Sequence, residues 1–131
     1  MTIGQLADAA GVNVETIRYY QRRGLMEVPS RPLGGQRKYN DESLRRIAFI
    51  RRAQDLGFTL EEITGLIAMA RNGDCRDGGE AAKRKYEELG SRLAELERMR
   101  GELARLVGRC EERRFRGACP VIRYLEGDAE A

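Results

Sequence analysis

Hydrophobic residues in the first part of the chain recur every three or four positions, which is the period of amphipathic helices. One such stretch covers residues 3–10, with Thr2 in the N-cap position and Gly11 at the turn that follows. A second stretch covers residues 14–23 and begins behind Asn13, another favourable N-cap. Two helices joined by a glycine-centred turn predict a helix-turn-helix motif, with the second helix as the recognition helix.

Proline and glycine interrupt the helical pattern in residues 28–40. This segment contains Pro29 and Pro32, then the adjacent pair Gly34 and Gly35, and ends in a short basic run. Turn-forming residues at this density are typical of a tight connection between short strands. We therefore predict a short β-hairpin, or wing, instead of a helix.

Two further helices are predicted after the wing. Asp41 caps the first of them, and Thr59 caps the second, where Glu62 completes a capping box. The polar and glycine-rich residues 71–79 then predict a hinge. Residues 1–70 are accordingly expected to form one compact head.

A single long amphipathic pattern fills residues 80–110. Its apolar positions follow spacings of three and four residues, with Arg100 interrupting one position: Tyr86, Leu89, Leu93, Leu96, Leu103, Val107 and Cys110. This pattern is the seam of a coiled coil. No other predicted helix is long enough to cover it, so we expect two copies of the chain to pair through this dimerisation helix. The last residues, 111–131, begin with a polar, basic loop.

Composition and charge are those of a soluble helical protein with a basic N-terminal part. Charged residues make up 34% of the 131 residues and the net charge is +3. Residues 1–55 carry ten Lys and Arg against six Asp and Glu, whereas residues 56–131 carry fourteen against fifteen. No apolar run approaches the ~20 residues of a membrane span, and no signal peptide is apparent. We expect a cytoplasmic protein whose basic head meets nucleic acid.

Three cysteines and the absence of histidine define the candidate chemistry. Thiols alone make a poor zinc site but suit a soft, thiophilic metal ion. Some ~30 helical residues place Cys75 roughly 45 Å from Cys110, so one chain cannot bring both to one ion unless its helix folds back. Two chains paired antiparallel can bring Cys75 of one to Cys110 and Cys119 of the other. The spacing therefore predicts a metal site shared between two chains.

Two other uses of the thiols compete with metal binding. An enzyme for redox or mercury-processing chemistry would need groups that are missing, because the chain has no histidine to act as general base. It also has no Cys-x-x-Cys motif and no nucleotide-binding loop, so we expect that it is not an enzyme. An oxidant sensor that pairs Cys110 with Cys119 in a disulfide stays open as an alternative.

Four segments strongly resemble the MerR family of bacterial transcription regulators. They are TIGQLA at residues 2–7, GVNVETIRYYQRRGL at 11–25, GQRKY at 35–39 and LGFTLEEI at 56–63. The resemblance implies a mostly α fold with a winged helix-turn-helix head, a long antiparallel coiled-coil dimerisation helix and a C-terminal metal-binding loop. It also implies a homodimer bound to double-stranded operator DNA. Such a dimer keeps a promoter silent without metal, and with metal it distorts the DNA so that RNA polymerase engages.

The same resemblance assigns DNA contacts to five residues. Thr16, Arg18 and Tyr19 match positions of the recognition helix that contact DNA in the family. Arg37 and Tyr39 match wing positions on the DNA backbone. Arginine and tyrosine suit phosphate and sugar contacts, which set the register of a protein on its operator.

The resemblance also makes the three cysteines ligands of Hg(II), and the ending Cys119-Pro120-Val121-Ile122 is similar to that of mercury-responsive members. Members that sense monovalent copper, silver or gold have serine at the position of Cys75, so a divalent ion is expected. Zinc-sensing members carry histidine and an extra cysteine in the terminal loop, which this chain lacks. Lead and cadmium stay open as alternative effectors.

Overall fold

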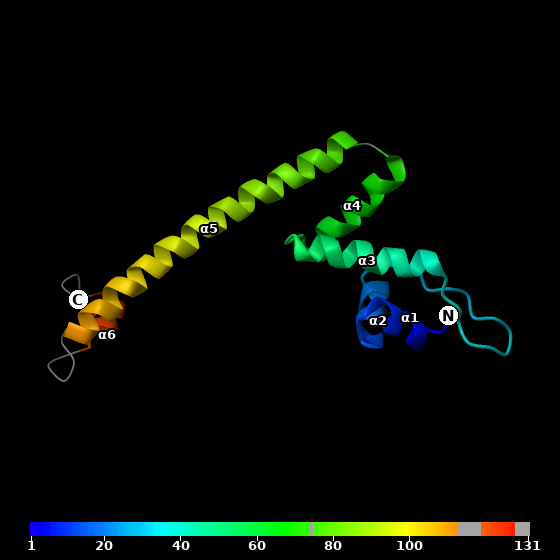
Figure 1. Ribbon diagram of the computed structural model, residues 1–131, viewed down its shortest axis with the longest axis horizontal. Coiled ribbons are helices and arrows are strands. Elements are labelled where there is room, and N and C mark those ends of the chain that lie inside the picture. Colours follow the sequence, from blue (N-terminus) through cyan, green and yellow to red (C-terminus); the bar gives the residue numbers. More distant parts are fainter. Residues whose placement is uncertain (74, 113–118, 128–131) are drawn as a thin grey trace. The chain divides into compact units, whose positions relative to one another are not determined.

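The computed structural model describes residues 1–73, 75–112 and 119–127. Within these ranges the chain forms helices and connecting loops only, which confirms the predicted mostly α class (Figure 1). The helices are α1 (Ile3–Ala10), α2 (Val14–Arg22), α3 (Asp41–Asp55), α4 (Leu60–Asn72), α5 (Cys75–Glu112) and α6 (Pro120–Leu125). The chain divides into two compact units, residues 1–85 and 86–131.

Side-chain caps determine where helices of the first unit begin. Thr2 and Gln5 form a capping box at the start of α1, and Thr59 and Glu62 form the predicted one at the start of α4. The side chain of Asn13 caps α2. Each cap satisfies backbone N–H groups that have no partner inside the helix, so it favours one starting residue.

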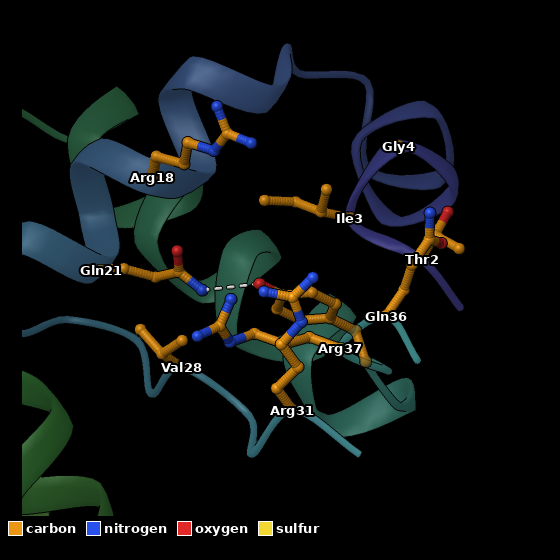
Figure 2. Close-up of a pocket in the computed structure, with 10 residues that line it drawn as sticks. Thr2, Ile3, Gly4, Arg18, Gln21, Val28, Arg31, Gln36 and Arg37 are labelled. Atoms are coloured by element: carbon orange, nitrogen blue, oxygen red, sulfur yellow. Dashed lines mark hydrogen bonds between the residues drawn. The ribbon is translucent and has the colours of Figure 1, made fainter. Parts of the chain in front are cut away.

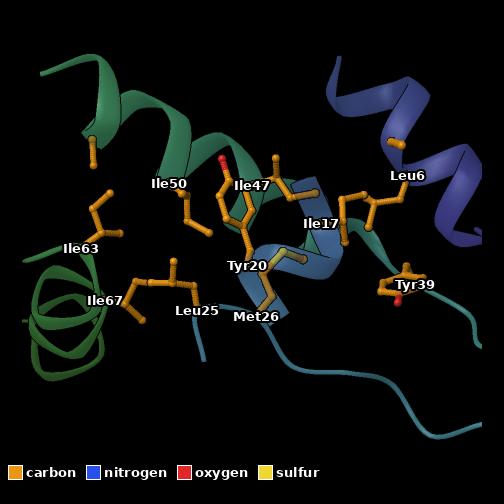
Figure 3. Packing of buried hydrophobic residues seen from close by; sticks show 12 residues of the cluster. Leu6, Ile17, Tyr20, Leu25, Met26, Tyr39, Ile47, Ile50, Ile63 and Ile67 are labelled. Carbon is orange, nitrogen blue, oxygen red and sulfur yellow. The ribbon is translucent and has the colours of Figure 1, made fainter. Parts of the chain in front are cut away.

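The first unit has one hydrophobic core, made by the facing sides of α1 to α4 (Figure 3). Helix α1 packs against α2 and α3, and α3 packs against α4. The large side chains that are fully buried are Leu6, Ile17, Leu25, Ile47, Ile50 and Ile63. Burying a side chain of this kind contributes about 1.5–3 kcal/mol. The core holds α2 rigidly, so the residues on its outer face have defined positions.

The predicted β-hairpin at residues 28–40 is wrong, because this part of the chain is an irregular loop without strands. Pro29 and Pro32 have no N–H to donate to a ladder, which disfavours strand pairing here. Sheet-like pairing is limited to Tyr39, whose N–H donates to the Met1 carbonyl at 2.6 Å. The amino group of Met1 donates back to the Tyr39 carbonyl at 2.8 Å. The loop is thus anchored to the N-terminus and not to a second strand.

The connection between α4 and α5 is shorter than the hinge predicted at residues 71–79. Helix α4 ends at Asn72, and Gly73 follows with a φ of 68°, the left-handed conformation that suits a helix end. Helix α5 begins at Cys75, five residues before the predicted start, and runs to Glu112. Whether the connection acts as a hinge, and whether the domains divide as expected, stay predictions.

The beginning of α5 is fastened to the head by a buried lysine. Lys85 is 5% exposed, and its Nζ lies 2.9 Å from Oε1 of Glu62. It also lies 5.5 Å from the centre of the Phe58 ring, within reach of a cation–π interaction. Ala81, one turn earlier on α5, is buried too. These contacts join α5 to the capping box that starts α4.

In the second unit, α5 carries an apolar stripe that this chain leaves uncovered. Its members are between 42% and 79% exposed: Tyr86, Leu89, Leu93, Leu96, Met99, Leu103 and Val107. An uncovered stripe of this length is larger than the scattered apolar residues of ordinary surfaces. It is the seam predicted from the sequence, and it has the pattern that a second helix covers in a coiled coil.

Candidate DNA-binding surface and metal centre

The N-terminal half of α2 presents Thr16 and Arg18 to solvent. The Thr16 N–H and its hydroxyl both donate to Oδ1 of Asn13, each at 2.8 Å. Arg18 lies two residues further along, and its Nη1 is 3.3 Å from Oε1 of Glu15. Both members of this ion pair are exposed, so it contributes little and leaves the guanidinium available to a stronger anionic partner.

At the C-terminal end of α2, two arginines contact the side chain of Tyr19. The guanidinium groups of Arg22 and Arg23 lie 5.8 Å and 5.7 Å from the centre of its ring. Arg23 Nη1 also donates to the Tyr19 hydroxyl at 2.9 Å. Tyr19 is 40% exposed. The tyrosine therefore orders two cations on the surface of the helix, which suits contact with phosphate groups.

A basic groove of ≈ 430 Å³ opens between the N-terminus of α1, the side of α2 and the loop at residues 28–40 (Figure 2). It is lined by Thr2, Ile3, Gly4, Arg18, Gln21, Val28, Arg31, Gln36, Arg37 and Tyr39. Three guanidinium groups and the positive end of a helix dipole thus converge on one concave surface. Such a surface attracts the phosphate backbone of a nucleic acid.

Tyr39 takes a place in the structure that differs from an exposed wing residue. It is 5% exposed, and its ring belongs to the hydrophobic core (Figure 3). Its hydroxyl reaches the groove, where it accepts a hydrogen bond of 2.9 Å from Nε2 of Gln21. Tyr39 therefore holds the Gln21 amide in position at the floor of the groove.

Of the five predicted DNA-contacting residues, the groove brings together Arg18, Arg37 and Tyr39. Thr16 and Tyr19 also lie on α2 but do not line it. Sequence reasoning missed Arg31, which shares the loop with Arg37. A second arginine among the prolines of that loop was the signal that could have identified it.

Two of the three predicted metal ligands meet in the second unit. Cys110 lies near the end of α5, and Cys119 directly precedes α6. The thiols of Cys110 and Cys119 lie close enough together for each to shift the pKa of the other. Helix α6 packs back on α5 beside them: Leu106 and Pro120 are buried, and the Arg105 guanidinium lies 5.5 Å from the Tyr124 ring.

The two thiols differ in acidity for physical reasons. Backbone N–H groups of Ile122 and Val121, followed by the Cys110 thiol, stabilise the Cys119 thiolate and lower its pKa. Partial desolvation raises the pKa of Cys110, and the neighbouring Cys119 sulfur raises it further. N–H groups directed at a sulfur atom favour its ionised form over the neutral thiol. A thiolate is the form that binds a metal ion.

We therefore expect Cys119 to react with iodoacetamide faster than Cys110, with the difference largest below the pKa of an ordinary thiol. A lowered pKa leaves more thiolate at a given pH, and the thiolate is the nucleophile. The measurement is peptide mass spectrometry of the folded, reduced protein after short exposure between about pH 6 and 8. The same peptides alkylated in denaturant serve as the control. Equal rates in the folded protein would contradict the assignment.

The third cysteine, Cys75, is the first residue of α5 and is exposed. Among the described residues of a single chain, no three side chains of His, Cys, Asp or Glu come close enough to hold one metal ion. The donor set nevertheless suits a thiophilic ion, because the pair at the end of α5 consists of sulfur alone. Most of the predicted basic loop, residues 113–118, lies outside the described residues.

None of the helices in the described ranges is both long and apolar enough to cross a membrane. Comparison with known protein families gives two overlapping matches along the chain. Residues 1–70 match the family described as "MerR HTH family regulatory protein", and residues 44–106 match "MerR, DNA binding". Together these matches include the head, the connection to α5 and most of α5 itself.

Individual relatives agree with this result over nearly the whole chain. A "Mercuric resistance operon regulatory protein" of Pseudomonas fluorescens is 42% identical over 129 residues, which are 98% of this chain and 90% of the relative. The fold is similar to that of MerR from Bacillus megaterium MB1 in complex with mercury(II), with a TM-score of 0.74 and 36% identity over 96% of this chain and 99% of that one.

A second solved structure is PbrR691 from Ralstonia metallidurans CH34 in complex with lead(II). It has a TM-score of 0.83 and 28% identity, covering 95% of this chain and 98% of that one. Regulators with this architecture bind DNA and act as dimers, as the helix-turn-helix head and the uncovered seam of α5 suggest independently. The chain therefore belongs to the MerR family of helix-turn-helix transcription regulators.

Proposed function

We propose that this protein is a mercury(II)-responsive regulator that silences a resistance promoter without metal and activates it by DNA distortion when mercury binds. The observation that carries the proposal is the neighbouring pair of thiols, Cys110 and Cys119, at the end of the dimerisation helix. The names of the mercuric resistance relatives support the choice of ion.

The ligand set is three thiolates drawn from two chains. Cys75 and Cys110 lie at opposite ends of α5, so a single chain does not bring them to one ion. In an antiparallel homodimer, Cys75 of one chain completes the pair Cys110 and Cys119 of its partner. Mercury(II) is soft and prefers sulfur donors, and each thiol releases its proton when it binds.

The ligand Cys75 has a direct structural connection to the head. It occupies the first turn of α5, and the same helix is fastened ten residues later through the ion pair of Lys85 with Glu62. A ligand that restrains the first turn of α5 therefore biases the placement of the heads on DNA. This biasing works only if mercury binds one arrangement of the heads better than the other. The shape of the promoter is then what RNA polymerase detects.

For DNA, we propose that Arg18, Arg31 and Arg37 bind phosphates of the operator in the basic groove. Thr16 and Tyr19 contact DNA from α2, while Tyr39 acts through Gln21. Cytoplasmic location and partnership with RNA polymerase follow from this role.

Replacing Arg18 with alanine is expected to weaken binding of operator and random duplex DNA by a similar factor, about 10-fold at low salt. The residue is expected to neutralise one phosphate, so the slope of log K against log salt should also fall by about one. Titration by fluorescence anisotropy at several salt concentrations measures both. Arg92→Ala, on the exposed surface of α5, is the matched control. A loss confined to the operator sequence would instead indicate that Arg18 reads a base.

Lead(II) is the second candidate effector. The specific observation in its favour is the similarity to lead-bound PbrR691, whose TM-score exceeds that of the mercury-bound regulator. Three thiolates also suit lead and cadmium, so the donor set does not separate these ions.

The deciding experiment titrates the reduced dimer on its operator with Hg(II), Pb(II), Cd(II) and Zn(II) in the presence of competing small thiols. Transcription in vitro from the promoter is the readout. Activation by Hg(II) alone, near the protein concentration, is the expected result. Activation by lead or cadmium at comparable concentrations would transfer the effector assignment to that ion. Absence of activation by all four would contradict the proposed function.

A further inference from the structure

The tip of the loop at residues 28–40 presents one leucine entirely to solvent. Leu33 has a relative exposure of 107%, the largest among the exposed large hydrophobic residues of the described chain. Its neighbours in the same shallow surface are Arg31, Pro32, Gly34, Gly35 and Gln36. A scattered exposed leucine needs no explanation by itself. The structure around this one, however, holds it out in a fixed position.

Hydrogen bonds make the tip a rigid turn. The Gly35 N–H donates to the Pro32 carbonyl at 3.1 Å, which closes a four-residue turn with Leu33 at its first central position. Gly34 follows with a φ of 70°, a conformation that glycine adopts without strain. Arg31 Nε donates across the turn to the Gly35 carbonyl at 3.2 Å. The backbone that carries the leucine is therefore ordered before binding, which lowers the entropy lost when the tip binds.

The base of the loop is braced in the same way and is positively charged. Arg37 Nε donates to the Pro29 carbonyl at 3.0 Å. Between residues 28 and 38 the sequence has Arg31, Arg37 and Lys38 and no Asp or Glu. An apolar tip flanked by basic residues fits a partner that has an anionic surface and an apolar interior.

Duplex DNA is the partner that the surroundings favour. Arg31 and Arg37 line the basic groove together with Arg18 of α2, so the tip continues the surface proposed to bind phosphates. In DNA, the minor groove lies between such phosphates, and apolar side chains, leucine among them, enter it as wedges between stacked base pairs. We propose that Leu33 is a minor-groove wedge that partly unstacks one base step on each flank of the operator. This proposal rests on the DNA-binding function proposed above.

A wedge of this kind gives the loop a share in the DNA distortion. Unstacking is least costly at flexible pyrimidine–purine steps, so Leu33 would favour operators with such a step under the tip. This preference would need no hydrogen bond to any base. Because the two chains of the dimer are symmetric, the two preferred base steps would lie at equal distances from the operator centre.

The test uses the full-length dimer on operator duplexes that carry 2-aminopurine at successive flanking positions, because this base brightens when it is unstacked. With the wild-type protein, fluorescence is expected to rise at one position on each flank. Leu33→Ala should abolish the rise and reduce the DNA bend measured by energy transfer between the duplex ends. Leu56→Ala removes another exposed leucine of the same head and is the matched control, for which the rise should persist.

The outcomes distinguish failure of the wedge proposal from failure of the proposed DNA-binding function. If the Leu33→Ala dimer binds the operator with the same fluorescence profile and bend as wild type, the wedge is wrong and the DNA-binding function stands. If the wild-type dimer fails to bind operator DNA, both are overturned. Binding of the wild type to phosphatidylglycerol vesicles that is lost in Leu33→Ala, with DNA bending unchanged, would assign the tip to a membrane surface instead.

Discussion

Two variants that are each unresponsive to mercury are expected to restore the response when they form a mixed dimer. The first variant carries Cys75→Ser, and the second carries Cys110→Ser with Cys119→Ser. In the mixed dimer, Cys75 of the second chain meets Cys110 and Cys119 of the first, so one site has all three thiolates. The other site has none.

The expected effect on the separate variants is large. Losing even a group that only orients a metal ligand costs 10–100-fold in affinity, so losing a ligand should raise the mercury concentration for half-maximal activation by about 100-fold or more. The mixed dimer, isolated from cells that express two differently tagged chains, should retain mercury against competing thiols with the affinity of the wild type. Retention is measured by mass spectrometry of the intact dimer, and activation by transcription in vitro.

The matched control mixes Cys110→Ser with Cys119→Ser. Each site of that dimer still has Cys75 but lacks one member of the pair, so no site is complete and no recovery is expected. A site formed within one chain predicts no recovery in the first mixture, because neither chain has all three cysteines. A disulfide between Cys110 and Cys119 predicts instead that the Cys75→Ser variant responds by itself, because it keeps both partners. Retained response of the wild type in strong reductant is the further result that argues against the disulfide.

The helices could be predicted from the sequence because their starts are decided by local contacts. Thr2 and Thr59 with their capping partners lie within four residues of the groups they cap, so the residue types alone indicate the result. Even so, α3 is capped by Asn40 and not by Asp41, since the Asn40 side chain accepts from the Ser43 N–H at 3.1 Å. Both residue types are good caps, and the pattern does not separate neighbours.

Features that depend on distant residues were predicted less well. The loop at residues 28–40 was expected to pair with itself, but Tyr39 pairs with Met1, 38 residues away. The burial of Tyr39 against the core, which turns a predicted DNA contact toward Gln21, depends on the same long-range arrangement. Periodicity and residue type describe neighbours along the chain, and they contain no information on which distant backbone groups meet.

The candidate metal centre is predictable from the sequence only in part. Family resemblance pointed to Cys110 and Cys119, and helix spacing separated them from Cys75. Their proximity, however, depends on α6 packing back on α5 around the buried Leu106 and Pro120. The difference in acidity follows from that packing, because it is the start of α6 that directs N–H groups toward Cys119.

Replacing Leu93 with glutamate is expected to dissociate the dimer, with a large loss of both operator binding and mercury binding. Leu93 lies near the middle of the α5 seam and is 61% exposed, so the head should fold unchanged. In a paired seam, the two copies would bury carboxylates without cationic partners, which costs several kcal/mol. A monomer then contacts only half of the operator and loses the gain from bivalent binding, which is about 100-fold or more.

Ser91→Glu is the matched control, because it adds the same charge two residues away, on nearly the opposite side of the helix. Sedimentation velocity should show monomers for Leu93→Glu and dimers for Ser91→Glu at the same concentration. Operator binding and retention of mercury should fall together in the first variant, since the two functions share one requirement, the pairing of α5. If Leu93→Glu stays dimeric and loses neither function, the chains do not pair through this seam. A metal site built from Cys75 of one chain and the thiol pair of its partner would then lose its structural basis, because the antiparallel seam is what brings opposite ends of two long helices together.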